Sequence, residues 1–134
     1  MRRQHERVCL WALVEAPEAL ARIGDIAAVR PGADVISVGR GDLSAALGLY
    51  GQIDHPDVIA AAERAIAEVR SRSNGDCISS AMVHSREDIA FWFEKGCRMF
   101  TYAADAILLM NAARHAVDAF RGYVPARGGS QVAS

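Results

Sequence analysis

The sequence lacks a long hydrophobic run, a surplus of charge of either sign and a paired set of cysteines. No apolar run approaches the roughly 18 residues that a membrane span needs. A net charge of −1 gives no electrostatic support for binding to nucleic acid. The 3 cysteines are odd in number and have no metal-ligand spacing, so we read them as reduced thiols. These absences favour a cytoplasmic protein with neither a membrane nor nucleic acid as its partner.

What is present is enough for one globular domain of 134 residues, half of them apolar. The first seven residues are arginine-rich, and no apolar stretch long enough for a signal peptide follows them. The last twelve contain proline, glycine and serine. We therefore expect a basic N-terminal arm over 1–7, a folded domain over 8–122 and a flexible tail over 123–134.

Strand and helix patterns alternate four times within this domain. Strands are predicted over 8–14, 34–38, 77–83 and 97–102. Helices are predicted over 16–29, 56–72, 85–95 (with Ser85 as its cap and Gly96 as its end) and 105–121 (ended by Gly122). A long loop is predicted over 39–55. Such alternation predicts an α/β fold of four parallel βα units with right-handed crossovers.

An acidic residue follows each of the first two predicted strands. Glu15 comes after an apolar run, and Asp42 lies just beyond a glycine pair that ends the second run. Alone, Glu15 is typical of a helix N-terminus and Asp42 of a turn or cap. Because parallel strands bring their carboxyl ends to one edge of a sheet, the pair can instead hold a hard divalent cation.

Four segments carry a resemblance to a known family. Its blocks are GRGDLSAALG over 39–48, GQIDHPDV over 51–58, GCRMF over 96–100 and DAILL over 105–109. They resemble the HpcH/HpaI aldolase family, whose members are metal-dependent (class II) pyruvate aldolases. The first block is fairly specific, the second supports it, and the similarity extends from Leu10 to Arg121.

The resemblance implies an eight-stranded TIM (βα)8 barrel, of which this chain is the C-terminal half. It implies Glu15 and Asp42 as ligands of Mg²⁺ or Mn²⁺, the ions that oxygen ligands favour. It also implies that the backbone of Gly41 lines the substrate. The family's general-base histidine and substrate-orienting arginine come from the N-terminal half and have no counterpart here.

The chain departs from the family pattern at two positions beside the acidic pair. Leu13 stands where a glutamine usually contacts substrate, which weakens recognition of a carbonyl group. Arg40 stands where a proline is usual, and we expect it to reshape the mouth of the site or to contact an acidic substrate. His84 follows the third predicted strand, which makes it a candidate substitute base, although it also reads as the residue before a helix cap.

Three readings of function remain open at this stage. The first is an aldolase-type carbon–carbon lyase that releases pyruvate or a related 2-oxoacid from a 4-hydroxy-2-oxoacid, or the C-terminal part of such an enzyme. The second is a non-catalytic half-barrel remnant that oligomerises. The third is a fragment of an acyl-CoA lyase similar to the citrate lyase β chain.

Four parallel strands cannot close a barrel alone, because two sheet edges and one sheet face stay uncovered. We therefore predict either a homo-oligomer or pairing with a chain that carries the N-terminal half-barrel. An open, doubly wound four-stranded layer is the other architecture that the pattern allows.

Overall fold

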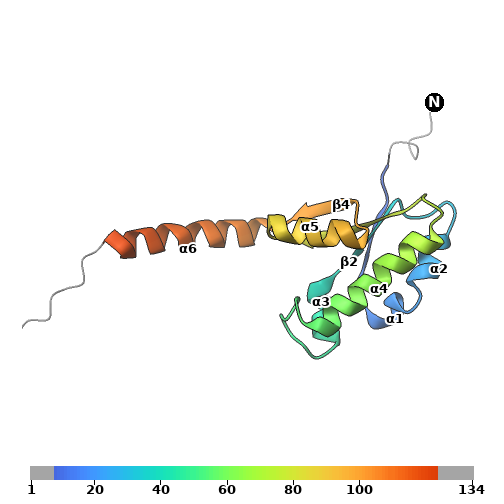
Figure 1. Ribbon diagram of the computed structural model, residues 1–134, viewed down its shortest axis with the longest axis horizontal. Coiled ribbons are helices and arrows are strands. Elements are labelled where there is room, and N and C mark those ends of the chain that lie inside the picture. The colour runs from blue at the N-terminus through green and yellow to red at the C-terminus, as the bar shows by residue number, and fades with distance from the viewer. Residues whose placement is uncertain (1–7, 124–134) are drawn as a thin grey trace, which may run out of the picture. The chain divides into compact units, whose positions relative to one another are not determined.

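The computed structural model describes residues 8–123, and its centre is one sheet of four parallel strands (Figure 1). The strands are β1 (Trp11–Val14), β2 (Val35–Val38), β3 (Ile78–Val83) and β4 (Met99–Tyr102). Each strand pairs with the next one in sequence, so the spatial order is β1-β2-β3-β4. The predicted α/β fold of four parallel βα units is confirmed.

Helices connect the strands and follow the last of them. They are α1 (Pro17–Leu20), α2 (Ile23–Ala28), α3 (Arg40–Ala46), α4 (Pro56–Arg72), α5 (Arg86–Lys95) and α6 (Asp105–Tyr123). The predicted helix over 16–29 is in fact two short helices, because Arg22 leaves helical geometry with φ −115° and ψ 13°. The last helix continues through Gly122, which we had expected to end it.

The predicted loop over 39–55 contains a helix, α3, that the sequence pattern did not reveal. Its glycines disfavour a helix, but Leu43 and Ser44 are almost completely buried. The Ser44 hydroxyl also donates to the Gly41 carbonyl at 2.6 Å. Tertiary packing therefore holds this short helix in place, and it begins directly after β2.

Local capping explains where the two longer helices of the sheet unit begin. The imidazole Nδ1 of His55 accepts a hydrogen bond from the Asp57 backbone N–H at 3.2 Å, which caps α4. Ser85 Oγ accepts from the Asp88 N–H at 3.0 Å, so the predicted cap of α5 is confirmed. Gly96, in the left-handed region with φ 110°, ends α5 as expected.

One face of the sheet packs against helices and forms the core. Side chains alternate along each strand, and one alternate set lies in the buried cluster: Val14, Ile36, Val38, Ala81 and Val83. The helices α2, α4 and α5 add the buried side chains Ile23, Ala27, Val58, Ile66 and Trp92. Because these helices share one face and the strands follow in order, the alternative of a doubly wound layer is wrong for the described residues.

We call the opposite face of the sheet the inner face. Strand register places on it Trp11, Leu13, Val35, Ser37, Ile78, Ser80, Met82, Met99 and Thr101. The buried core cluster contains none of them, and Leu13 is 59% exposed. A hydrogen bond of 2.6 Å from Trp11 Nε1 to Ser37 Oγ runs across this face. It is the surface that would point into a barrel.

The contacts of the chain divide it into two compact units, with the boundary after Tyr102. In the second unit, α6 is described by itself, and none of its residues is buried. Leu109 and Phe120, both apolar, are 74% and 75% exposed. Among residues 8–123, no helix is both long and apolar enough to cross a bilayer. The expected arm over 1–7 and most of the expected tail lie outside the described residues.

Candidate metal centre

Glu15 leaves the end of β1 and lies across the backbone of the neighbouring strand. The Gly39 N–H donates to the Val14 carbonyl at 2.9 Å, which continues the parallel pairing by one step. A Cβ atom placed on Gly39 would stand 2.8 Å from Glu15 Oε2 and 2.9 Å from Glu15 Cβ. Glycine at this position is therefore what allows the carboxylate to approach the end of β2.

Asp42 reaches the same place from the first turn of α3. Burial raises the pKa of the Glu15 carboxyl, and the charge of Asp42 and a side-chain hydrogen bond with it raise that pKa further. The effect of Asp42 on this pKa requires the two carboxyl groups to lie near one another. The structure thus brings together the two acids that the sequence singles out, while their role as metal ligands stays a prediction.

The donor chemistry of this pair fits a hard divalent cation. Both donors are carboxylate oxygens, Asp42 is exposed, and a cation would relieve the repulsion between two negative charges. Among residues 8–123, no group of three or more His, Cys, Asp or Glu side chains is placed to hold a metal. Further ligands would come from water, substrate or residues outside the described part of the chain.

The backbone beside Asp42 is open to a ligand. Gly41 is exposed, and a Cβ atom placed on it would meet nothing within 4 Å. This space suits the predicted contact between its main chain and a substrate, which stays a prediction. Leu13 precedes Glu15 by two residues on the inner face, and its Cδ1 would lie 3.4 Å from a Cβ on Gly39. The surface beneath the acidic pair is therefore apolar on this side.

Arg40 is not an open side chain at the mouth of the site. It is only 7% exposed, and its guanidinium donates to Asp54 Oδ1 and to the Met82 carbonyl, each at 2.9 Å. The same group stacks over the ring of Trp92 at 4.9 Å from its centroid. These partners occupy the cation within the fold, so the geometry favours a structural role over the predicted contact with an acidic substrate.

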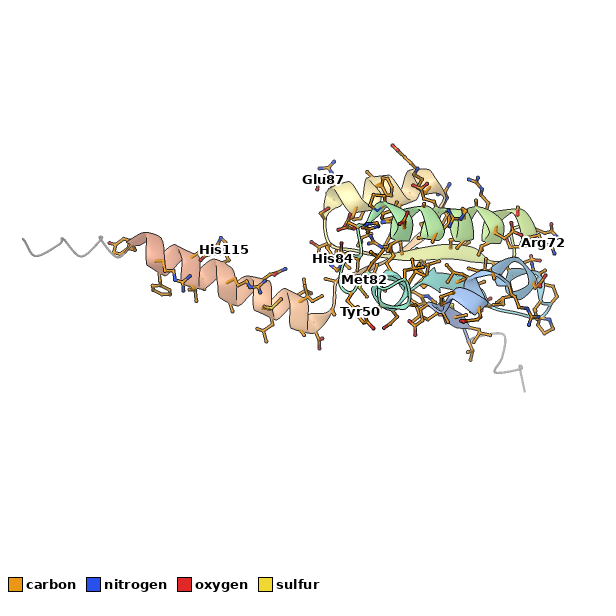
Figure 2. The ribbon with its side chains drawn as sticks, turned by 90° about the horizontal axis from the view of Figure 1, so that it is seen from below. Tyr50, Arg72, Met82, His84, Glu87 and His115 are labelled. Carbon is orange, nitrogen blue, oxygen red and sulfur yellow. The ribbon has the colours of Figure 1, made fainter. Side chains whose placement is uncertain are left out.

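His84 lies at the same carboxyl edge of the sheet, directly after β3. Its backbone N–H donates to Asp88 Oδ2 at 2.9 Å, and its carbonyl accepts from the Tyr102 hydroxyl at 3.1 Å. Figure 2 shows His84 and Met82 at one end of the sheet unit, opposite Arg72 at the far end of α4. The main chain of His84 is fixed, and its proposed action as a base stays a prediction.

Sequence reasoning missed two residues near the site. Asp54 and Trp92 hold the Arg40 side chain, yet nothing in their local patterns indicates this contact. For Asp54, the sequence offers one signal. It lies in the block over 51–58, which is one of the segments that carry the family resemblance.

A singly wound parallel sheet with a carboxylate pair at its carboxyl edge has the architecture of one half of a βα-barrel enzyme. A sequence model described as HpcH/HpaI aldolase/citrate lyase matches residues 1–116. A hydroxypyruvate/pyruvate aldolase of Pseudomonas aeruginosa is 39% identical over 126 residues, which are 93% of this chain and 45% of that protein. A 4-hydroxy-2-oxo-heptane-1,7-dioate aldolase of Escherichia coli is 30% identical over 115 residues, 84% of this chain and 42% of that protein.

The solved structures agree with the sequence matches. A HpcH/HpaI aldolase/citrate lyase family protein from Burkholderia cenocepacia superimposes with a TM-score of 0.74 at 31% identity, over 90% of this chain and 48% of that one. The chain therefore belongs to the HpcH/HpaI aldolase/citrate lyase family. It spans less than half the length of the curated relatives named above.

Proposed function

We propose that this chain forms the metal-binding half of an aldolase-type carbon–carbon lyase. The reaction releases pyruvate or a related 2-oxoacid from a 4-hydroxy-2-oxoacid. The observation that carries the proposal is the placement of Glu15 over Gly39, with Asp42 near it, at the carboxyl edge of a half-barrel sheet. The names of the similar aldolases support the same class of reaction.

Each residue of the site has a separate task in this proposal. The carboxylates of Glu15 and Asp42 would hold Mg²⁺ or Mn²⁺, which when bound supplies Lewis-acid chemistry for a 2-oxoacid. Gly41 exposes its backbone, so that the polar end of the substrate can approach closely. His84 directly follows β3 at this edge, and we assign it the proton transfer that aldol cleavage requires.

A second candidate function rests on the inner face and on the sheet edges. Both β1 and β4 have one edge without a strand partner among the described residues, and exposed apolar side chains lie on the face between them. We propose that a second copy of this chain, or a chain carrying the N-terminal half-barrel, covers this surface. A half-barrel that only assembles, without catalysis, would show the same surface.

Exchange of the methyl protons of pyruvate for deuterium, followed by NMR, tests the first function. We expect exchange that depends on Mg²⁺ or Mn²⁺, because an enolising site must remove a proton from that methyl group. We expect the Asp42→Ala variant to lose both the exchange and its binding of Mn²⁺ while it stays folded. Glu87→Ala is the matched control, since Glu87 is an exposed acid in the first turn of α5.

The outcomes separate the two functions. Folded protein that binds Mn²⁺ but shows no exchange would support the non-catalytic half-barrel. Unchanged Mn²⁺ affinity in Asp42→Ala would show that the metal site is wrongly assigned. If exchange persists in His84→Ala, the base is a group other than His84.

A further inference from the structure

We infer that Arg40 is a positioning residue that fixes Asp42 for metal binding. The inference rests on the proposed function and adds a residue to it. Arg40 is the first residue of α3, and Asp42 is the third, so whatever holds the first turn of this short helix also places the carboxylate.

Arg40 connects this turn to three other segments. Its guanidinium donates to the Met82 carbonyl near the end of β3 and to the Asp54 carboxylate in the segment before α4. It also covers the ring of Trp92, which is 1% exposed, on α5. We call this set of contacts the Arg40 clamp. All of its partners except Asp54 belong to the sheet or to a helix packed on it.

The rest of α3 is held by its buried side chains. Leu43 and Ser44 anchor it to the core, and the Leu43 N–H donates to the Gly39 carbonyl at 3.0 Å. A helix of seven residues has little stability of its own. Without the clamp, its first turn would keep the core anchor but lose its connection to β3 and α5.

Burial of an arginine is costly unless its charge and its donors are satisfied. Here two hydrogen bonds, one of which is the ion pair with Asp54, and an aromatic face satisfy it, although Asp54 itself is 78% exposed. An exposed ion pair contributes little to stability. The Arg40 clamp differs from such a pair because its guanidinium is buried and has several partners. Because Arg40 begins the helix that carries Asp42, we attribute the burial of its charge to the placement of that carboxylate.

The sign of one measurement distinguishes positioning from simple electrostatics. Arg40 carries a positive charge next to a cation site, so removing that charge alone would strengthen the binding of Mn²⁺. Loss of positioning would weaken it, and changes in residues that orient metal ligands commonly cost about tenfold or more in affinity. We therefore expect Arg40→Met to bind Mn²⁺ about tenfold more weakly.

The experiment measures Mn²⁺ affinity by electron paramagnetic resonance and amide hydrogen exchange in the metal-free protein, for the full chain and its variants. Arg40→Lys keeps the charge but loses the two-pronged donation, and we expect an intermediate loss of affinity. In both variants, the amides of α3 should exchange faster than in the wild type, with little change elsewhere. If Arg40→Met does not fold, Arg40→Lys tests whether Arg40 positions Asp42.

Arg30→Met is the matched control. Arg30 also holds several segments, through Asp76, the Ala27 and Val29 carbonyls and the Ser73 carbonyl, but it follows α2 at the opposite, amino edge of the sheet. We expect this variant to lose stability without a change in Mn²⁺ affinity or in the exchange of α3.

The two readouts fail independently of each other. Unchanged or tighter Mn²⁺ binding in folded Arg40 variants would overturn the positioning role while leaving the metal site intact. The same role would be overturned if α3 amides exchanged as in the wild type. If the wild type binds no Mn²⁺ but the variants loosen α3, the proposed function fails and the clamp stands as an anchor of α3.

Discussion

The two faces of the sheet are built from the same four strands, and yet only one of them packs against helices. On the helix face, Ile36 and Val83 are 1% and 0% exposed and pack beneath α4 and α5. On the inner face, Leu13 and Met82 are 59% and 44% exposed. One residue of displacement along a strand separates the two environments, since neighbouring side chains point to opposite faces.

The difference shows which contacts this chain can satisfy by itself. The helix face obtains its covering from segments that directly follow each strand, so the crossovers complete it locally. The inner face needs strands from elsewhere, as in any closed barrel. The carboxylate pair stands at the boundary: Glu15 continues the inner face of β1, and Asp42 comes from the helix after β2.

The largest expected effect is on stability, and it tests the comparison directly. Ile36→Ala should lower the free energy of unfolding by about 2–5 kcal/mol, because it empties space in a packed core. Leu13→Ala removes a side chain of the same size from the inner face and should change it by no more than about 0.5 kcal/mol. Urea unfolding followed by circular dichroism measures both.

Equal losses in the two variants would contradict this picture. They would mean that the inner face is covered in solution, either by a second copy or within the single chain, and that Leu13 is then as buried as Ile36. Repeating the unfolding at several protein concentrations distinguishes these cases, because only assembly between chains depends on concentration.

The element order was predictable from the sequence because its signals are local. The Ser85 cap and Gly96 each act within a few residues of a helix end, and the structure confirms both. The helix α3 was missed because its stability comes from the burial of Leu43 and Ser44, which depends on the rest of the fold. The low helix propensity of glycine alone predicts a loop for this segment.

The same division applies to the site. The proximity of Glu15 and Asp42 could be predicted, because parallel strands align their carboxyl ends whatever the details of packing. The partners of Arg40 could not, because Asp54 and Met82 lie 14 and 42 residues further along the chain. Only the tertiary fold, which carries the Arg40 side chain to the end of β3 and to Trp92 of α5, brings them together.

The pH dependence of the free energy of unfolding tests whether water is excluded from the core on the helix face. Cys97 is 0% exposed within the core, and burial raises its pKa from 9.0 to about 11, although the nearby Arg98 and Arg40 act in the opposite direction. A thiol whose pKa is raised by folding contributes stability in full below its unfolded value and loses it as pH rises toward the folded value. The relevant window therefore lies between 9.0 and about 11.

Between about pH 8 and pH 10, the wild type should lose about 1.4 kcal/mol more stability than Cys97→Ala. Urea unfolding at each pH gives this difference, in which the other titrating groups cancel. Cys9→Ala is the control, because it removes a thiol that is exposed rather than buried. Identical slopes in wild type and Cys97→Ala would mean that water reaches this part of the core.

The last expected effect concerns assembly through the inner face. Ile78 lies on that face at the start of β3 and is 38% exposed, far from the carboxylate pair at the other end of the strands. If a second copy covers the face, Ile78→Lys places a charge in the interface and should raise the dissociation constant about tenfold. Sedimentation velocity over a range of concentrations measures this shift.

Ile89→Lys provides the matched comparison, since Ile89 is 36% exposed on α5, away from the inner face. The two substitutions are chemically identical and start from nearly equal exposure, so they differ only in the face that receives the charge. Weaker assembly in Ile78→Lys alone would locate the interface on the inner face. An equal effect of both, or an effect of Ile89→Lys alone, would assign self-association to the helices and leave the inner face for a chain with the other half-barrel.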